Sequence, residues 1–380
     1  MIYLDYNATT PIDNAVADAM LPYLYGHFGN PSSSHELGIE AKKAIENSRK
    51  QVANLLGCTP NEIVFTSGGS ESNNTVIKGV AHTYKNKGNH IITSKIEHPA
   101  IINPCKYLES IGYDVSYVPV DQYGMVNPSD VEKLITDQTI LVTIMHSNDE
   151  VGTIQPIEEI SSICKKYNVL FHTDASQSIG KVPINVESLG VDFLTVAGHK
   201  LYAPKGIGAL FIRNGIHIES LIHGAGHESG RRAGTDNIIL EVGLGKACEI
   251  SAEALKSSEI KKLTEYFYDN LKERFGDRIH LNGHSEKRLP NTLNVSFLGY
   301  NGHEVLNQLE ETAASTGSAC HSGMTSISPV LNAMGVTEDV GRGAVRFSLG
   351  RYTTKDEIDS VISNLNKIVI LHFPGNISLS

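Results

Sequence analysis

A lysine and an aspartate, each at the end of an apolar segment, carry the clearest chemistry in this sequence. Lys200 follows the segment 191–196, and Asp174 ends the segment 169–174. Because open α/β sheets bind ligands at the carboxyl ends of their strands, both side chains can face one crevice. Pyridoxal phosphate (PLP) needs such a pair: a lysine that forms a Schiff base and a carboxylate that keeps the pyridine nitrogen protonated. One such pair by itself is also compatible with two surface residues that happen to end strands.

A turn rich in glycine and serine, residues 67–70, lies between the apolar segment 63–66 and a helical pattern. Gly69 lets the backbone approach an anion, Ser70 can add a hydroxyl donor, and the start of the following helix attracts a phosphate group. The turn has neither the Walker lysine pattern nor GxGxxG. Many strand-to-helix turns are rich in these residues for steric reasons, so the turn alone is a weak indication of a phosphate site.

Three polar residues follow strand ends and are candidates for contacts with the same cofactor. An imidazole at His98 can stack on a flat ring and carry protons. Gln177 can donate an amide hydrogen to the phenolic oxygen, and His199 can donate to the phosphate. The alternative interpretations are a turn residue, a polar residue at a helix start and a packed histidine.

Two further residues indicate how a substrate would be handled. Cys320 lies among the small residues 317–323, which favour mobility, and an exposed thiol can become a nucleophile once it is ionised. The alternative is a buried structural cysteine. Arg346, within a strand pattern, can grip a substrate carboxylate with two hydrogen bonds, or form an ordinary ion pair.

Composition excludes several classes of protein. The chain has 380 residues, which favours two domains, and its net charge of −10 gives no electrostatic case for binding nucleic acid or an anionic membrane. No apolar run approaches a membrane span, and the first residues lack a signal-peptide pattern. Five scattered cysteines indicate reduced thiols, and we therefore expect a cytoplasmic protein. The 16 histidines show no metal-ligand spacing, so we expect no metal.

The order of the patterns predicts an α/β fold. From residue 60 to 215, apolar segments alternate with helical patterns, which indicates a mainly parallel sheet with helices on both faces. Residues 237–275 are helix-prone and could bridge to a second domain, and mixed patterns after them indicate a smaller α+β domain. We place the large domain at residues 16–255 and the small domain at 1–15 plus 256–380, with the cysteine loop at about 313–330.

A series of motifs runs in order over nearly the whole chain: Tyr3-Leu-Asp-Tyr-Asn-Ala-Thr-Thr-Pro, Gly29-Asn-Pro-Ser-Ser, Phe65-Thr-Ser-Gly-Gly-Ser-Glu-Ser-Asn-Asn, Glu97-His, Asp174-Ala-Ser-Gln, Gly198-His-Lys, Arg232-Ala-Gly-Thr, Gly317-Ser-Ala-Cys and Arg346-Phe-Ser-Leu-Gly-Arg. In this order and spacing the chain resembles the cysteine desulfurases of the aminotransferase class V group. Each motif alone is modest, but the series is highly specific.

The resemblance implies a PLP-dependent homodimer of fold type I, with each active site at the subunit interface. It implies that Lys200 forms the Schiff base, that Asp174 pairs with the pyridinium nitrogen and that His98 stacks on the ring. The other cofactor contacts that it implies come from Gln177, Gly69, Ser70, His199, Asp149 and, from the neighbouring subunit, Thr235. The substrate contacts that it implies come from Arg346 and Asn30, and Cys320 would form the persulfide.

The implied reaction takes sulfur from L-cysteine, leaves L-alanine and loads the sulfur on Cys320. The persulfide would then serve an acceptor protein in iron–sulfur cluster or thio-cofactor biosynthesis. The stretch around Cys320 is also similar to selenocysteine lyases, which leaves release of selenium from selenocysteine as an alternative. An aminotransferase, or a partner protein that keeps the fold without catalysis, are more distant alternatives.

Three positions depart from the family pattern. Asp149 stands where many members have an asparagine that contacts the phenolic oxygen, and a carboxylate there would repel a phenolate and a substrate carboxylate. Ala197 replaces a frequent phosphate-binding serine, and Ala233 replaces a common serine beside Thr235.

Overall fold

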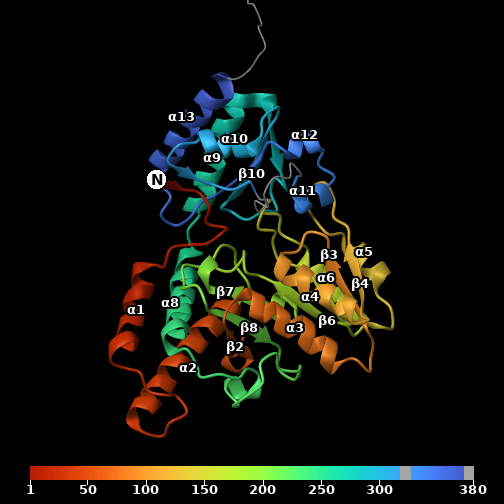
Figure 1. Ribbon diagram of the computed structural model, residues 1–380, viewed down its shortest axis with the longest axis vertical. Coiled ribbons are helices and arrows are strands. Elements are labelled where there is room, and N and C mark those ends of the chain that lie inside the picture. Colours follow the sequence, from red (N-terminus) through yellow and green to blue (C-terminus); the bar gives the residue numbers. More distant parts are fainter. Residues whose placement is uncertain (317–326, 372–380) are drawn as a thin grey trace, which may run out of the picture.

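The computed structural model describes residues 1–316 and 327–371, and it consists of a larger and a smaller part (Figure 1). The larger part is built on a seven-stranded sheet covered by helices. The smaller part, which holds both the first residues and the last described helix, lies against one end of the larger part.

The strands of the large sheet are, in spatial order, β2 (Ile63–Thr66), β8 (Gly208–Ile212), β7 (Phe193–Ala197), β6 (Leu170–Asp174), β5 (Thr139–Thr143), β3 (His90–Ser94) and β4 (Asp114–Val118). The five strands from β7 to β4 run parallel, whereas β8 is antiparallel to both β2 and β7. The expected α/β fold with a mainly parallel sheet is therefore confirmed.

The helices of the larger part are α1 (Asn14–Tyr25), α2 (Glu36–Leu56), α3 (Gly69–Thr83), α4 (Pro99–Ser110), α5 (Pro128–Leu134), α6 (Ile157–Lys166), α7 (Val186–Leu189) and α8 (Ile238–Ala254), with short 3₁₀ turns η1 (Pro60–Glu62), η2 (Gly198–Lys200) and η3 (Glu228–Gly230). They bury both faces of the sheet. Ile63 and Phe65 point into one hydrophobic core, and Val64 between them points into the other. This alternation follows from the two-residue period of a strand.

The smaller part contains the antiparallel strands β9 (Ile279–Asn282), β10 (Thr292–Phe297) and β12 (Ala344–Ser348), the pair β1 (Ile2–Tyr3) and β11 (Thr312–Ala313), the 3₁₀ turn η4 (Gly276–Arg278), and the helices α9 (Glu259–Phe275), α10 (Gly302–Gln308), α11 (Pro329–Ala333), α12 (Glu338–Gly341) and α13 (Lys355–Leu371). It has its own hydrophobic core, in which Leu4 near the start of the chain packs with Phe267 and Phe347. The chain therefore enters this part twice.

The helix-prone segment 237–275 forms two helices rather than one. The first, α8, packs on α1 and α2 in the larger part, and α9 packs on α13 in the smaller part. The two parts have separate hydrophobic cores. The division into a large domain at residues 16–255 and a small domain at 1–15 plus 256–380 stays a prediction. Within the described residues, we find no helix with the length and apolar character needed to cross a bilayer.

Candidate functional site

The ends of two neighbouring strands place Lys200 and Asp174 at the same edge of the sheet. Asp174 is the last residue of β6, and the 3₁₀ turn that follows β7 ends at Lys200. The two strands are parallel and adjacent, with Asp174 opposite Thr195. The structure therefore brings together the lysine and the carboxylate that the sequence pattern had suggested.

Neutral donors hold the Asp174 side chain, which is 8% exposed. One carboxylate oxygen accepts a hydrogen bond from Asn73 Nδ2 at 2.7 Å, and the other accepts from the Ser176 amide at 2.9 Å. These bonds fix the orientation of the carboxylate without neutralising its charge. Asp174 thus keeps the capacity to pair with a cationic ring nitrogen.

The environment of Lys200 lowers the pKa of its amine. Its Nζ donates to the carbonyl oxygens of Asn7 and Ala8. Burial lowers the pKa of Lys200 below its usual value, Arg346 lowers it further, and the charges of Asp149 and Asp174 act in the opposite direction. A neutral amine is the form that can act as a nucleophile or a base.

Arg346 reaches the same site from β12 in the smaller part. Its guanidinium donates to the Asp5 carboxylate at 2.7 Å and to the Asp149 carbonyl at 3.2 Å, and it lies 3.6 Å from the Asp149 carboxylate. Its Nε is buried without a hydrogen-bond partner in the part of the chain that the structure describes. The site therefore contains a buried guanidinium whose Nε can still donate a hydrogen bond, and such a group suits a carboxylate ligand.

Asn7 links several of these groups, although sequence reasoning named it only as part of a motif. Its carbonyl accepts from Gln177 Nε2 at 2.9 Å as well as from Lys200. A second lysine, Lys181, donates to Asn7 Oδ1 and to Gln177 Oε1, both at 2.9 Å. Burial lowers the pKa of Lys181 well below its usual value. Sequence reasoning missed Lys181, because nothing in its local pattern distinguishes it from a surface lysine.

The Gly/Ser-rich turn forms the other end of the site. Gly68 has a φ of 145°, which favours glycine, and Gly69 is the first residue of α3. A Cβ atom at Gly69 would lie 3.1 Å from Ser176 Oγ, so the backbone lies close to the segment after β6. Ser70 is exposed, and it lines a shallow pocket of about 430 Å³ together with His98.

The two predicted histidines have different surroundings. His98 is exposed, and its Nδ1 accepts from the Ala100 amide at 3.1 Å at the start of α4. His199 is half-buried and shares a hydrogen bond with Thr9 Oγ1 at 3.1 Å. Burial, followed by the charge of Lys200, lowers the pKa of His199 to about 4, so its ring is neutral at neutral pH.

Two predicted residues do not contact this site within the described chain, and a third lies outside the described residues. Thr235 is exposed in the loop before α8. Asn30 is exposed in the loop after α1, a helix of 12 residues or about 18 Å, and its Oδ1 accepts from the Ser32 amide at 2.9 Å. Cys320 lies outside the described residues.

Two buried titratable groups lie behind the site and were not predicted to belong to it. Burial raises the pKa of Glu97 to about 8, and its Oε1 accepts from Ser94 Oγ and the Met145 amide. His172, two residues before Asp174, bonds to Thr143 and Thr195, and burial lowers its pKa to about 4. Both groups are uncharged at neutral pH.

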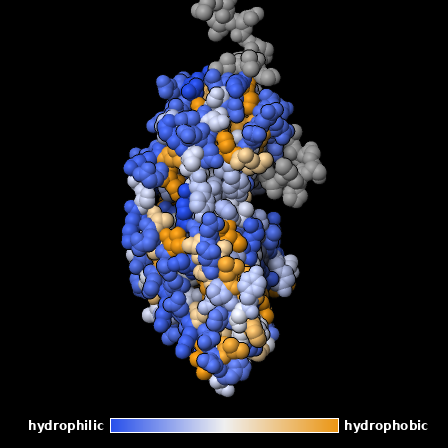
Figure 2. All heavy atoms as spheres, turned by 90° about the vertical axis from the view of Figure 1, so that its left-hand side faces the viewer, coloured by the Kyte–Doolittle hydropathy of each residue, from blue (hydrophilic) through white to orange (hydrophobic). Residues whose placement is uncertain are grey.

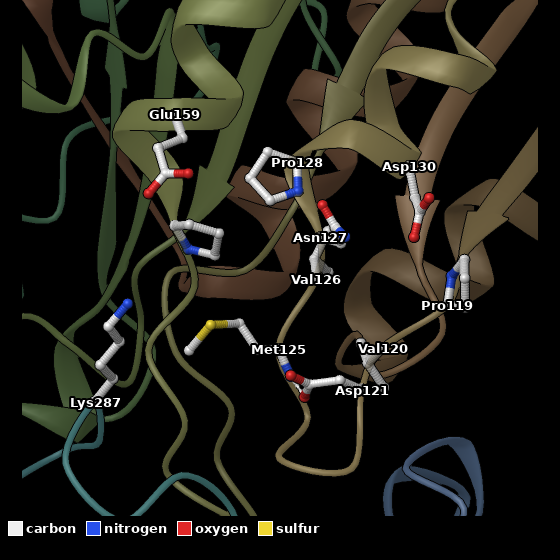
Figure 3. A pocket seen from close by; sticks show the side chains of 11 residues that line it. Pro119, Val120, Asp121, Met125, Val126, Asn127, Pro128, Asp130, Glu159 and Lys287 are labelled. Carbon is white, nitrogen blue, oxygen red and sulfur yellow. Dashed lines mark hydrogen bonds between the residues drawn. The ribbon is translucent and has the colours of Figure 1, made fainter.

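Figure 3 shows a pocket elsewhere, of about 400 Å³, which contains none of the predicted site residues. Its carboxylates come from Asp121, Asp130 and Glu159, and Lys287 lies on the same side of the pocket as Glu159, across from Asp130. Asp121 Oδ1 already accepts from the amides of Tyr123 and Met125, so it shapes its own turn. Within the described residues, no group of three or more His, Cys, Asp or Glu side chains is arranged to hold a metal ion.

Known proteins with the same architecture define the class. The model of the aminotransferase class-V family matches residues 2–361, so the chain belongs to this family. Cysteine desulfurase IscS of Dictyoglomus turgidum is 47% identical over 373 residues, which are 97% of this chain and 94% of the relative. A solved NifS-like protein superposes with a TM-score of 0.90 at 41% identity, covering 97% of this chain and 99% of its own. A second solved structure, SspA in complex with cysteine, gives a TM-score of 0.84 at 39% identity, covering 93% of this chain and 100% of its own. Within the class V family, this chain therefore groups with the cysteine desulfurases.

Proposed function

We propose that this chain uses PLP to remove sulfur from L-cysteine, with release of L-alanine, and that Cys320 takes up the sulfur. The observation that carries the proposal is the convergence of Lys200, Asp174 and Arg346 from two strand ends and the smaller part of the chain. The relatives named cysteine desulfurase support the same reaction.

PLP fits the groups that surround this edge of the sheet. Bound there, it would supply an electron sink for the substrate carbon that loses a proton. Lys200 would hold it covalently and Asp174 would face its ring nitrogen, held in place by Asn73. The other residues that we propose as cofactor contacts are Gly69, Ser70, His98, Asp149, Gln177, His199 and, from the partner subunit, Thr235.

Substrate binding is proposed to centre on Arg346. Its Nε, which has no hydrogen-bond partner among the residues that the structure describes, offers a donor to a carboxylate. Asp5 and Asp149 hold the rest of the guanidinium. Lys200, whose pKa is lowered by burial, is the base that we propose to take the proton from the substrate Cα. His98, exposed at the start of α4, is proposed to carry protons during alanine release. We leave Asn30 as a predicted substrate contact.

The sulfur step is proposed to use the Cys320 thiolate as nucleophile. The thiolate attacks the substrate sulfur, an S–S bond forms, and the substrate C–S bond breaks with its electron pair going to carbon. Protonation of that carbon gives alanine, and the enzyme retains a persulfide. An acceptor protein in iron–sulfur cluster or thio-cofactor biosynthesis would then take the sulfur.

We propose a homodimer whose contact includes α1 and the loop after it. Large apolar side chains are exposed there, among them Tyr25 at 84% and Phe28 at 76%. Figure 2 shows the face on the α1 side, where hydrophobic residues interrupt an otherwise hydrophilic surface. Exposed apolar groups that gather in one region are typical of an interaction surface.

Product analysis tests the proposed function. Purified, PLP-loaded protein should form alanine from L-cysteine and a persulfide on Cys320, and Cys320→Ala should abolish the persulfide. Cys58→Ala, at a half-buried thiol, is the matched control and should keep both products. A Cys320→Ala protein that desulfurates cysteine at the full rate would overturn the proposed sulfur step.

The same assay separates the alternatives. Turnover of selenocysteine without turnover of cysteine would identify a selenocysteine lyase. With a keto acid added as amino acceptor, 3-mercaptopyruvate in place of alanine would identify an aminotransferase. Failure to bind PLP would identify a partner protein without catalysis.

A further inference from the structure

A cavity of about 800 Å³ lies between the larger and smaller parts of the chain. Its lining comes from the end of α8, the start of α9, the segment before β10 and the segment around Gly180. Apolar side chains such as Leu255, Ile260 and Leu289 form much of its wall. Lys200 is the one predicted site residue in its lining, so the cavity adjoins the candidate site but is distinct from it.

Arg288 is half-buried and supplies a positive charge to this cavity. Its guanidinium donates to the Thr292 carbonyl at 2.6 Å, and in the described residues it makes no ion pair with a carboxylate. Burial lowers the pKa of Arg288 to about 10, which reflects the cost of a charge held away from water. A half-buried cation that has no counter-charge among the described residues favours an anionic ligand.

Other donors also face the cavity without an acidic partner. Ser251 is 1% exposed, and its Oγ has no hydrogen-bond partner among the described residues. Over residues 1–316 and 327–371, the hydrogen bonds of Lys181 Nζ go to the neutral oxygens of Asn7 and Gln177. At the start of α9 the Ser258 side chain makes no cap, although the Glu259 amide donates to Ser257 Oγ at 3.3 Å. The helix start therefore adds positive potential to the cavity.

The carboxylates in the lining do not neutralise these donors. Glu259 is exposed and pairs with Lys262 at 3.1 Å, and Glu265 is exposed and lies 3.8 Å from Lys261. Glu286 is exposed as well. The buried part of the cavity is therefore positive and the apolar wall is extensive.

We propose that this cavity binds a small organic anion with an apolar body, whose negative group pairs with Arg288. The site adjoins the proposed catalytic centre, because Lys181 and Lys200 both donate to Asn7. A ligand here would thus contact both parts of the chain and the hydrogen-bond network that holds Lys200.

Calorimetry with PLP-loaded full-length protein tests the proposal, using octanoate, octyl phosphate and the uncharged octanamide. Either anion should bind at least about tenfold more tightly than octanamide, since one charge-assisted hydrogen bond is worth about that factor. The anion that binds more tightly identifies the head group. Arg288→Met should weaken anion binding about tenfold. Arg342→Met, at an exposed arginine of α12, is the matched control and should leave binding unchanged. Equal binding of octanamide, or unchanged binding by Arg288→Met, would overturn the proposal.

Crystallography of the wild-type protein gives an answer that does not depend on the variant. Crystals grown with 8-bromooctanoate should show anomalous bromine signal inside the cavity and the carboxylate within hydrogen-bond distance of Arg288. Bromine located only at Arg346 or on the outer surface would contradict the assignment.

Discussion

Asp149 sets the charge balance around Lys200 and Arg346. After burial, its carboxylate has the largest effect on the pKa of Lys200, which it raises. It also lies 3.6 Å from the Arg346 guanidinium that we propose to bind substrate. Asp149, the position that departs from the family pattern, therefore influences both the proposed base, Lys200, and the proposed substrate-binding residue, Arg346.

Asp149→Asn should lower the pKa of Lys200 further, because it removes a negative charge that stabilises the ammonium form. In cofactor-free protein, the pH at which an amine-specific reagent begins to modify Lys200 should then move to lower values, as followed by peptide mapping. Asp114→Asn, at an exposed aspartate, should leave the profile unchanged. A shift to higher pH would show that Asp149 does not act on Lys200 in this way.

Glu97 should make the stability of the fold depend on pH. Its pKa is raised from 4.5 to about 8, so the folded state keeps a proton that the unfolded state loses as the pH rises. The contribution of Glu97 is fully present below pH 4.5 and is lost progressively up to about pH 8. Glu97→Gln, which stays neutral, should therefore gain stability relative to the wild type between these limits.

Denaturant unfolding at pH 5 and pH 8 measures this difference. Glu304→Gln, at an exposed glutamate, should show the same difference from the wild type at both values. If the difference in unfolding free energy between Glu97→Gln and the wild type were also the same at both pH values, the Glu97 carboxyl would have to be ionised in the folded protein.

At the level of elements, the contact between β8 and the turn before α3 positions the proposed phosphate end of the site. A Cβ atom at Gly208 would lie 2.5 Å from the Val196 carbonyl oxygen and 2.7 Å from the Gly68 Cα. Only glycine permits this approach, and the turn before α3 depends on it.

Gly208→Ala should displace that turn and weaken PLP binding about tenfold, since overpacking of this kind costs about 1–3 kcal/mol. Titration of the apoprotein with PLP, followed by cofactor absorbance, measures the change. Gly226→Ala, where an added Cβ meets nothing nearer than 4.0 Å, is the control. Equal PLP affinity in the two variants would mean that the turn does not set the phosphate contacts.

The sequence predicted the strands and turns of the site wherever a local residue pattern was enough to identify them. β6 and β7 are short segments with an apolar pattern and lie inside the sheet. Their ends could therefore be located from the sequence, and these ends identified Asp174 and Lys200. The break at residues 255–258 between α8 and α9 was not predicted, because helix-forming residues continue through it. Asn7, Lys181 and Glu97 were missed as site residues because their roles arise from contacts with segments distant in the chain.

At the scale of the whole molecule, we expect two copies to be needed for a complete site. Thr235 is exposed in its own chain, and Asn30 lies at the far end of α1 from the segment that contacts Lys200. Apolar residues at α1 and the following loop offer a surface for the second copy.

Phe28→Asp should weaken the dimer at least about tenfold, because it places a charge in an apolar contact. Sedimentation over a concentration series measures the dissociation constant. Ile111→Asp, at a residue that is 56% exposed after α4, should leave it unchanged. A wild-type protein that sediments as a monomer throughout would contradict the proposed dimer.

The identity of the lysine that carries PLP is the most direct test of the account. Two half-buried lysines with lowered pKa, Lys200 and Lys181, both donate to Asn7, and of the two only Lys200 follows the end of β7 next to Asp174. Borohydride reduction of the PLP-loaded protein converts the bond between cofactor and lysine into a stable amine, which peptide mass spectrometry can locate. We predict a single phosphopyridoxyl group on Lys200, absent from Lys200→Ala and retained in Lys181→Met. A label on Lys181 or on surface lysines, with none on Lys200, would contradict the assignment on which the proposed function rests.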